Sequence, residues 1–413
     1  MRVKTFRFCV VLASLAISLL GCSTLTSEVQ SATQDSTAEA SLGHPSPVPV
    51  QAEFVYVANL GPASTHSGSI SGYAIDRHSG KLVPVPGSPF PAEDGPSTIA
   101  SDPHGDHVFV LEKTFSLPGE PCSHVKGVLL SENVHELSGT LSLADKITLD
   151  GSCPASLAVD PRGKFLYVGM ETTDAVGLGK RMLGEIQVFA IQANGKLREI
   201  AGSPFQVAPP LQSLAMHPDG KLLYAATGDD RNGIVVFIRD PETGSLSLPI
   251  TVASRPQSML AIGPDDDFMI GDSPSVVDQV TLFRINEVSG DLTAQSPMAI
   301  VLPWGISVHP SGKFAAIAAT RLSPGLPGEI LIYRMDSSSS GMTQVPGPAA
   351  SAGNGTFDVK FDAQGSFVYA VAENDNSIAG FSFNGSSGAL TPVPGSPFQT
   401  GQSPIALTVV RPK

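Results

Sequence analysis

Positively charged residues are scarce in this sequence, and no run of them follows the first seven residues. Charged residues make up 15% of the 413 residues, and the formal net charge is −13. Phosphate binding depends on clustered Lys and Arg, so this composition argues against contact with nucleic acid or anionic lipid. Amphipathic stretches of helical length are missing too, which argues against a helical protein. We expect a monomer that binds no nucleic acid.

Catalytic and cofactor-binding signatures are also missing. The sequence has no Gly-x-Ser-x-Gly elbow, no His-Glu-x-x-His motif and no phosphate-binding Gly-x-x-x-x-Gly-Lys loop. Two short acidic clusters, at 229–232 and 373–375, offer oxygen ligands but no full set for a hard cation. The sequence therefore predicts neither a metal site nor a cofactor.

The N-terminal segment 1–21 has the composition of an export signal. Arg2, Lys4 and Arg7 are followed by an apolar stretch and then by small residues, which is the order of a signal peptide. An uncleaved anchor helix is the alternative, although the apolar stretch is short for a bilayer span. The segment ends Leu-Leu-Gly before Cys22, which resembles the lipobox of bacterial lipoproteins. This resemblance implies that the leader is removed and that Cys22 carries lipid.

A lipid on Cys22 would be the only contact of the protein with a membrane. The resemblance implies an exported bacterial lipoprotein, and Ser23 after the cysteine favours the outer membrane, facing the periplasm or the cell surface. Loss of the three leader cations would leave a net charge of −16. Residues 22–52 are rich in Ser, Thr, Ala and Pro without apolar periodicity, so we expect a disordered tether there.

The rest of the chain, from residue 53 onward, consists of repeats. Each unit has a short apolar strand, a tight hairpin, a β-rich strand, a loop, an alternating strand and a turn ending Gly-x-Leu. In such hairpins Asp or His accepts from the backbone, Pro presets the second position and Gly closes the turn. Glycine and proline are accordingly abundant, with 41 and 35 residues. The six hairpins begin at Asp102, Asp160, His217, Gly263, His309 and Asp362.

A seventh unit is divided between the two ends of this region. Residues 54–59 form a β-rich strand with no first strand before it, and residues 404–410 form a first strand with nothing after it. Pairing the two closes a ring and hides the open sheet edge. The sequence therefore predicts an all-β fold, a seven-bladed β-propeller over residues 53–413 closed by its C-terminal strand.

The linker phrase Gly-Ser-Pro-Phe occurs at 87–90, 202–205 and 395–398. Together with the repeats, it resembles YVTN-type propellers and the wider lactonase-type seven-bladed family, which includes 6-phosphogluconolactonases and carboxymuconate-cyclising enzymes. The resemblance implies that enzyme members carry a Gly-Pro-Arg-His phrase, supplying a cation and a histidine at one first strand. None of the aligned triplets contains Arg-His: they are Pro96-Ser97-Thr98, Pro154-Ala155-Ser156, Leu211-Gln212-Ser213, Pro303-Trp304-Gly305 and Thr356-Phe357-Asp358.

The mouth of the central channel is the expected ligand site, because loops and blade links meet there. Trp304, the only tryptophan, starts a first strand, where it either stacks on a sugar or lactone ring or packs to fill the channel. Asp358 and Glu112 are a candidate carboxylate pair for acid–base chemistry. The predicted ligand-binding residues are Asn59, Glu112, Gln212, Asp272, Trp304 and Asp358.

Two cysteines, Cys122 and Cys153, remain once Cys9 leaves with the leader and Cys22 takes lipid. In an oxidising compartment such a pair more often forms a disulfide than a metal site. Cys122 falls in a long loop of one blade and Cys153 in the link to the next, on the same face. We therefore predict a disulfide between them, with two free thiols as the alternative.

Two functions follow from these observations. An intact scaffold without the Arg and His of the enzymes favours a non-catalytic propeller at the cell envelope, whose loop face binds a protein or a saccharide-like ligand. The alternative is a lactone hydrolase like the 6-phosphogluconolactonases, with Asp358 or Glu112 as base and Arg231 or Arg321 holding an anionic group. A purely structural envelope protein is a third possibility.

Overall fold

The computed structural model describes most of the chain from residue 52 to the C-terminus, and every regular element in this part is a β-strand. None of the described residues forms a helix long and apolar enough to span a bilayer. The predicted signal peptide, Cys22 and the tether up to residue 51 lie outside the described residues. The described ranges are 52–62, 67–92, 94–113, 126–150, 152–174, 181–207, 210–227, 232–253, 255–265, 267–273, 279–295, 297–300, 302–320, 327–336 and 341–413.

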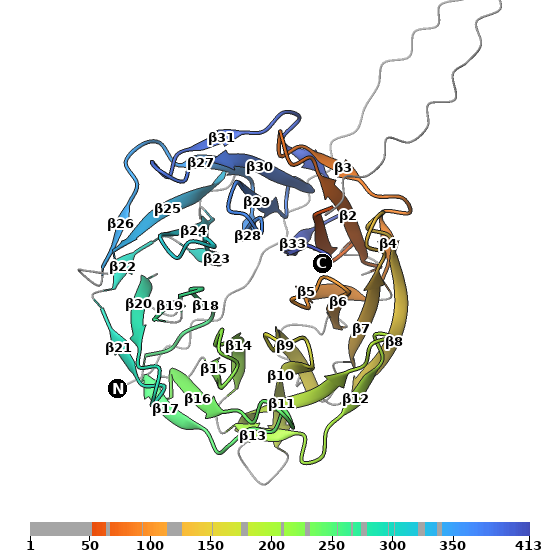
Figure 1. Cartoon of the computed structure of the whole chain (residues 1–413), viewed down its shortest axis with the longest axis vertical. Helices are drawn as coiled ribbons and strands as arrows, with labels where there is room; N and C mark the ends of the chain where they lie inside the picture. The colour runs from red at the N-terminus through yellow and green to blue at the C-terminus, as the bar shows by residue number, and fades with distance from the viewer. Residues whose placement is uncertain are drawn as a thin grey trace, which may run out of the picture. The chain divides into compact units, whose positions relative to one another are not determined.

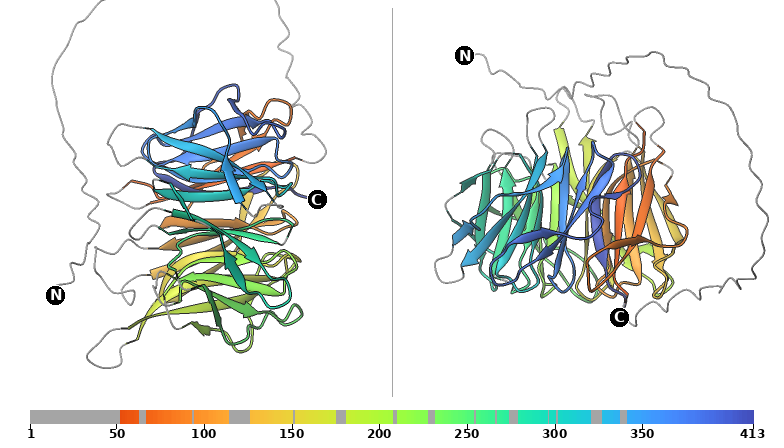
Figure 2. Two further views of the ribbon diagram at one scale, coloured as in Figure 1. Left: turned by 90° about the vertical axis from the view of Figure 1, so that its left-hand side faces the viewer. Right: turned by 90° about the horizontal axis from the view of Figure 1, so that it is seen from above.

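Seven antiparallel sheets surround one axis, and each forms one blade (Figure 1). The first strand of each blade lies nearest the axis, and Figure 2 shows the blades from the side. The predicted seven-bladed β-propeller is confirmed. Blade 1 contains β33 (Pro404–Val410), β1 (Phe54–Asn59), β2 (Ser69–Ile75), β3 (Leu82–Pro84) and β4 (Phe90–Pro91); blade 2 contains β5 (Gly95–Ser101), β6 (His107–Lys113), β7 (Lys126–Val134) and β8 (Leu141–Asp150).

The remaining blades follow in chain order. Blade 3 contains β9 (Ser152–Val159), β10 (Phe165–Asp174), β11 (Arg181–Ile191), β12 (Leu197–Glu199) and β13 (Phe205–Val207); blade 4 contains β14 (Leu211–Met216), β15 (Leu222–Thr227), β16 (Ile234–Ile238) and β17 (Ile250–Ala253). Blade 5 contains β18 (Leu260–Ile262), β19 (Phe268–Ser273), β20 (Gln279–Ile285), β21 (Leu292–Ala294) and β22 (Met298–Ala299). Blade 6 contains β23 (Pro303–Val308), β24 (Phe314–Ala319), β25 (Gly328–Asp336), β26 (Gly341–Gln344) and β27 (Ala350–Gly353); blade 7 contains β28 (Thr356–Phe361), β29 (Phe367–Ala372), β30 (Ser377–Phe383), β31 (Leu390–Pro392) and β32 (Phe398–Gln399).

The ring closes in blade 1, where the last strand of the chain pairs with the first. β33 is antiparallel to β1, with Phe54 opposite Val410 and Asn59 opposite Pro404. In Figure 1 the blue C-terminal strand lies on the inner side of the orange N-terminal strands. Closure by the C-terminal strand is therefore confirmed, and it removes the inner sheet edge that β1 would otherwise expose.

The Asp-Pro-x-Gly hairpins join first and second strands at one end of the ring, here called the hairpin face. Asp160 and Asp362 each accept a backbone N–H of the second strand on Oδ1, at 2.7 Å from Phe165 and 2.7 Å from Phe367. His309 serves the same purpose, because its Nδ1 accepts the N–H of Ser311 at 2.9 Å. The polar first residue therefore holds the turn closed, as the pattern predicts.

A repeated contact joins neighbouring blades near the same face. The tyrosine of a second strand donates its hydroxyl to the carbonyl of the Gly-x-Leu glycine in the next blade, and we call this the tyrosine–glycine joint. Each of these tyrosines is fully buried. A Cβ on Gly139 would lie 2.5 Å from the ring of Phe54, and the φ of Gly139 is +68°, so only glycine fits. The four joints are Tyr56 to Gly139 (2.6 Å), Tyr167 to Gly244 (2.9 Å), Tyr224 to Gly290 (3.0 Å) and Tyr369 to Gly80 (2.8 Å).

The Gly-Ser-Pro-Phe phrase divides the outermost strand of three blades into two short pieces. Its serine accepts a backbone N–H of the third strand, as Ser88 does from Gly72 at 2.9 Å and Ser396 does from Gly380 at 3.0 Å. The following proline is cis, and the phenylalanine then begins the second piece, for example β4. The phrase thus turns the chain from the outer edge of one blade toward the next.

Loss of one joint should be measurable as lost stability. Tyr224→Phe leaves the Gly290 carbonyl without its donor, so we expect the free energy of unfolding to fall by about 1 kcal/mol. Tyr333→Phe is the matched control, because Tyr333 is buried and its hydroxyl makes no hydrogen bond within the described structure. Urea unfolding of the two variants compares them, and equal midpoints would show that the joint adds no stability.

Removal of the closing strand should affect the whole ring. A chain ended after Ser403 lacks β33 and exposes the inner edge of β1, so we expect the single cooperative thermal transition to be lost or to fall by more than 10 °C, roughly the effect of a few kcal/mol. A chain ended after Arg411 is the control. Circular dichroism at 218 nm, about the β-sheet minimum, follows both. An unchanged transition in the shorter chain would contradict closure by β33.

Candidate functional site

Six of the seven first strands carry one extra residue near their start, opposite the hairpin face. The register shifts there by one residue, as between Pro96 and Thr98 or between Pro303 and Gly305. Such a bulge re-aims the extra side chain. These side chains are exposed or half-buried, whereas the residue before each is buried. The extra residues, together called the axial rim, are Ser97, Ala155, Gln212, Trp304, Phe357 and Ile405.

Two aromatic side chains lie together on the axial rim. The rings of Trp304 and Phe357 have their centroids 5.0 Å apart and are tilted by 42°. Trp304 is still 43% exposed. The indole is therefore supported by a neighbour from the next blade and keeps a face open to solvent, which is the arrangement that a flat or ring-shaped ligand needs.

Asp358 follows Phe357 in β28, but its carboxylate already accepts three hydrogen bonds from the protein. Oδ1 accepts from the N–H of Val359 at 2.8 Å and from Nζ of Lys360 at 2.6 Å. Oδ2 accepts from the N–H of Leu407 at 3.1 Å, which connects blade 7 to the closing strand β33. Only 8% of the residue is exposed. Asp358 thus holds the closure of the ring and would have to give up these bonds to act as a base.

Three other predicted ligand-binding residues are buried inside their blades. Asn59 donates Nδ2 to Ser71 Oγ at 3.0 Å, and Asp272 Oδ1 accepts from the N–H of Met259 at 2.5 Å. Glu112 is 0% exposed. Burial, with the nearby Glu112 carboxylate as the smaller cause, raises the pKa of Glu132 to about 7. These side chains order the interior, so the axial rim brings together only Gln212 and Trp304 as exposed predicted residues.

A polar chain next to the axial rim was not predicted from the sequence. Gln212 donates Nε2 to Glu171 at 2.7 Å. Burial raises the pKa of Glu171, while the charge of Lys113 and the Gln212 bond oppose the rise. Burial lowers the pKa of Lys113, opposed by the Glu171 charge. Lys113, Glu171 and Gln212 come from blades 2, 3 and 4, and only the alignment of second-strand ends could have suggested the first two.

The axial rim also tests the comparison with the lactonase motif. The arginine of the lactonase motif aligns with the extra residue of each first strand. None of the six residues of the axial rim is a lysine or an arginine. The next position aligns with the histidine, but Ser156 at this place accepts the N–H of Leu214 at 2.9 Å and joins two blades. Arg231 and Arg321, the predicted anion-holding residues, lie outside the described residues.

The predicted disulfide is only partly within the described structure. Cys153 in β9 is disulfide-bonded. Its predicted partner Cys122 lies outside the described residues, so the pairing stays a prediction. Asp229 of the first acidic cluster lies outside them as well. Among the residues that are described, no three His, Cys, Asp or Glu side chains gather to hold a metal ion.

Comparisons with known proteins agree with this architecture. A search of curated protein sequences finds no match. The family model described as "Lactonase, 7-bladed beta-propeller" matches residues 176–262, from blade 3 to the first strand of blade 5. A solved structure of a putative 6-phosphogluconolactonase from Bacteroides uniformis is 17% identical, with a TM-score of 0.69 over 87% of this chain and 99% of that one.

Two further solved structures are similar. The putative 6-phosphogluconolactonase of Bacteroides fragilis is 19% identical, with a TM-score of 0.67 over 89% of this chain and 100% of that one. The periplasmic gluconolactonase PpgL of Pseudomonas aeruginosa is 18% identical, with a TM-score of 0.67 over 87% and 99% of the two chains. Such identities show a common fold and transfer no catalytic residue. The resemblance predicted from the repeats is confirmed: the lactonase propeller model matches part of this chain, and the chain is a seven-bladed β-propeller.

Proposed function

We propose that this propeller binds a ring-shaped, saccharide-like ligand on its axial rim without converting it. The observation that carries the proposal is the Trp304–Phe357 pair, which is held across two blades and exposed at the rim. Aromatic faces bind the apolar face of a sugar or lactone ring. Gln212 of blade 4 has an exposed amide whose nitrogen donates to Glu171 and whose oxygen can accept a hydrogen bond from such a ring.

The hydrogen bonds of Asp358 and the burial of Glu112 support binding without chemical conversion of the ligand. Asp358 is engaged by three donors and Glu112 is buried, so neither predicted base faces a ligand on the rim. A general base must reach the proton that it removes. The positions aligned with the Arg and His of the lactonase motif also carry neither residue.

Lactone hydrolysis is the second candidate, and two observations favour it. The family model is that of lactonases, and the similar structures include gluconolactonases by name. Glu171 and Lys113 have pKa values shifted toward neutrality by burial, which is common for catalytic groups. In this mechanism Glu171, with its pKa raised, would activate water, and Lys113 would hold the anionic end of the substrate.

Tryptophan fluorescence of this protein comes from the axial rim alone, because Trp304 is its only tryptophan. We expect the fluorescence of Trp304 to change saturably with D-glucose or another neutral, cyclic monosaccharide. Phe357→Ala should weaken binding about fivefold, since stacking on an aromatic pair contributes roughly 1 kcal/mol. Tyr333→Phe, away from the rim, should leave the affinity unchanged. A panel of sugars that leaves the fluorescence unaltered would contradict the proposal.

A hydrolysis assay distinguishes ligand binding without conversion from lactone hydrolysis. The opening of 6-phosphogluconolactone, followed against its uncatalysed rate, should not be accelerated by the protein. Acceleration that disappears in Glu171→Gln or Asp358→Ala, while the fold is kept, would replace the binding proposal with a lactonase. Glu287→Gln, which removes the same negative charge from an exposed turn of blade 5, is a control for surface charge.

We further propose that lipid on Cys22 attaches the propeller to the outer membrane and that Cys122 pairs with Cys153. Support comes from the signal-like segment 1–21 and from the disulfide-bonded state of Cys153. The oxidising compartment that such an address implies would maintain the disulfide.

Attachment can be tested in a bacterial host. Cys22→Ser should abolish incorporation of labelled palmitate and leave the leader attached, because a serine cannot carry the thioether-linked lipid that precedes cleavage. Cys9→Ser, inside the leader, should leave both unchanged. An unmodified chain that takes up no palmitate and keeps residues 1–21 would indicate the alternative, an uncleaved anchor helix.

A further inference from the structure

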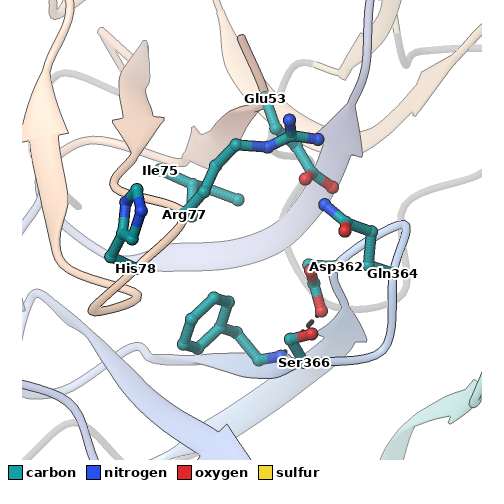
Figure 3. A pocket seen from close by; sticks show the side chains of 8 residues that line it. Glu53, Ile75, Arg77, His78, Asp362, Gln364 and Ser366 are labelled. Carbon is teal, nitrogen blue, oxygen red and sulfur yellow. Dashed lines mark hydrogen bonds between the residues drawn. The ribbon is translucent and has the colours of Figure 1, made fainter. Parts of the chain in front are cut away.

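A cavity of about 250 Å³ lies between blade 7 and blade 1 on the hairpin face, away from the axial rim (Figure 3). Its walls come from the residue before β1, from the β2–β3 turn and from the hairpin between β28 and β29. The lining includes one guanidinium, two carboxylates and two apolar side chains. These charged and apolar groups belong to Glu53, Ile75, Arg77, Asp362 and Phe367.

Arg77 presents two buried donors at this cavity. Its Nε and Nη2 are buried and have no hydrogen-bond acceptor among the described residues. These two nitrogens lie on one edge of the guanidinium, and their parallel N–H groups match the two oxygens of a carboxylate. Buried donors without a partner are unfavourable, so a ligand group here would be bound strongly.

The repeat does not require this arginine. Residues at the same place in other Gly-x-Leu turns are Glu136, Pro241, Glu287 and Gly385. At the position of Arg77, these turns have a glutamate, a proline or a glycine. The conformation of the turn therefore does not depend on a cation. Arg77 is therefore a departure of blade 1 from the repeat, at a place where a cavity lies beside it.

Carboxylates form the opposite wall. Glu53 is 1% exposed, and one of its oxygens accepts the N–H of Ala363 at 2.7 Å. Burial is the main cause that raises the pKa of Glu53, and the charge of Arg77 opposes the rise. Arg77 and Glu53 are thus within electrostatic reach but form no ion pair in the described structure. Asp362 adds a second buried carboxylate, which the backbone of its hairpin holds.

This arrangement selects for a ligand that carries both charges. A simple anion on Arg77 would face the carboxylates of Glu53 and Asp362, and a simple cation at Glu53 would face the guanidinium. A group with a carboxylate and an ammonium satisfies both walls. Ile75 and Phe367 are buried and offer an apolar surface to a small side chain. The volume equals that of about eight water molecules at roughly 30 Å³ each, which suits a small amino acid.

We propose that this cavity binds a small α-amino acid, with its carboxylate on the Nε–Nη2 edge of Arg77 and its ammonium on Glu53. This site is separate from the axial rim, and its ligand would bind whether or not a saccharide occupies the rim.

Calorimetric titration of the full chain tests the proposal. L-Alanine and L-valine should bind saturably with one site per chain, and acetate and ethylammonium, which each carry one charge, should bind at least tenfold more weakly. Arg77→Gln should weaken alanine binding at least tenfold. Lys81→Gln is the matched control, because it removes one positive charge from the same turn outside the cavity.

Three results would overturn the assignment. Acetate binding as tightly as alanine would make the cavity an anion site. The absence of binding by all four compounds would make it a structural cavity. Alanine binding that is equal in Arg77→Gln and Lys81→Gln would place the ligand elsewhere. Thermal unfolding shows whether Arg77→Gln keeps the ring, and the comparison of the four compounds on the unmodified chain is decisive if it does not.

Discussion

The geometry of this propeller depends on the tyrosine–glycine joint between neighbouring blades. A fully buried hydroxyl donates to a glycine carbonyl of the next blade in four places, including the closure, where Tyr369 of blade 7 reaches Gly80 of blade 1. Between blades 2 and 3 the tyrosine position is Phe109, and Ser131 donates to Gly195 at 2.7 Å instead. The Gly195 carbonyl thus receives a hydrogen bond although the tyrosine is absent. Because these contacts and the apolar blade faces define how neighbouring blades meet, they also position everything at the axis.

The axial rim follows from that constraint. Six of the seven inner strands carry a bulge near their start, and such a bulge re-aims one side chain. The fold therefore provides a ring of variable positions on a constant framework. In this chain the ring carries Trp304, Phe357 and Gln212, whereas the lactonase motif would carry an arginine there. Function can change at these positions without any cost to the joints beneath them.

Local signals explain what the sequence alone could predict. The number of blades could be predicted from the hairpin phrases and the Gly-x-Leu turns, because each of these motifs consists of a few adjacent residues. The closure could be predicted from the seventh unit, whose strands are divided between the two ends of the repeat region. Trp304 was found because it is unique. Contacts between blades could not be predicted, because they join residues far apart in the chain, 49 positions in Asp358–Leu407 and 289 in Tyr369–Gly80, with no sequence pattern of their own. Hence the Phe357 contact, the engaged carboxylate of Asp358, the Lys113–Glu171 pair and the Arg77 cavity became evident only in the folded chain.

If the axial rim is the ligand site, its aromatic pair contacts the sugar. A crystal structure of the protein soaked with the sugar that saturates the Trp304 signal would reveal this contact. We expect an intact sugar ring against the exposed surface of Trp304, beside Phe357 and hydrogen-bonded to Gln212. A sugar bound elsewhere on the propeller, with the rim side chains unchanged, would contradict it.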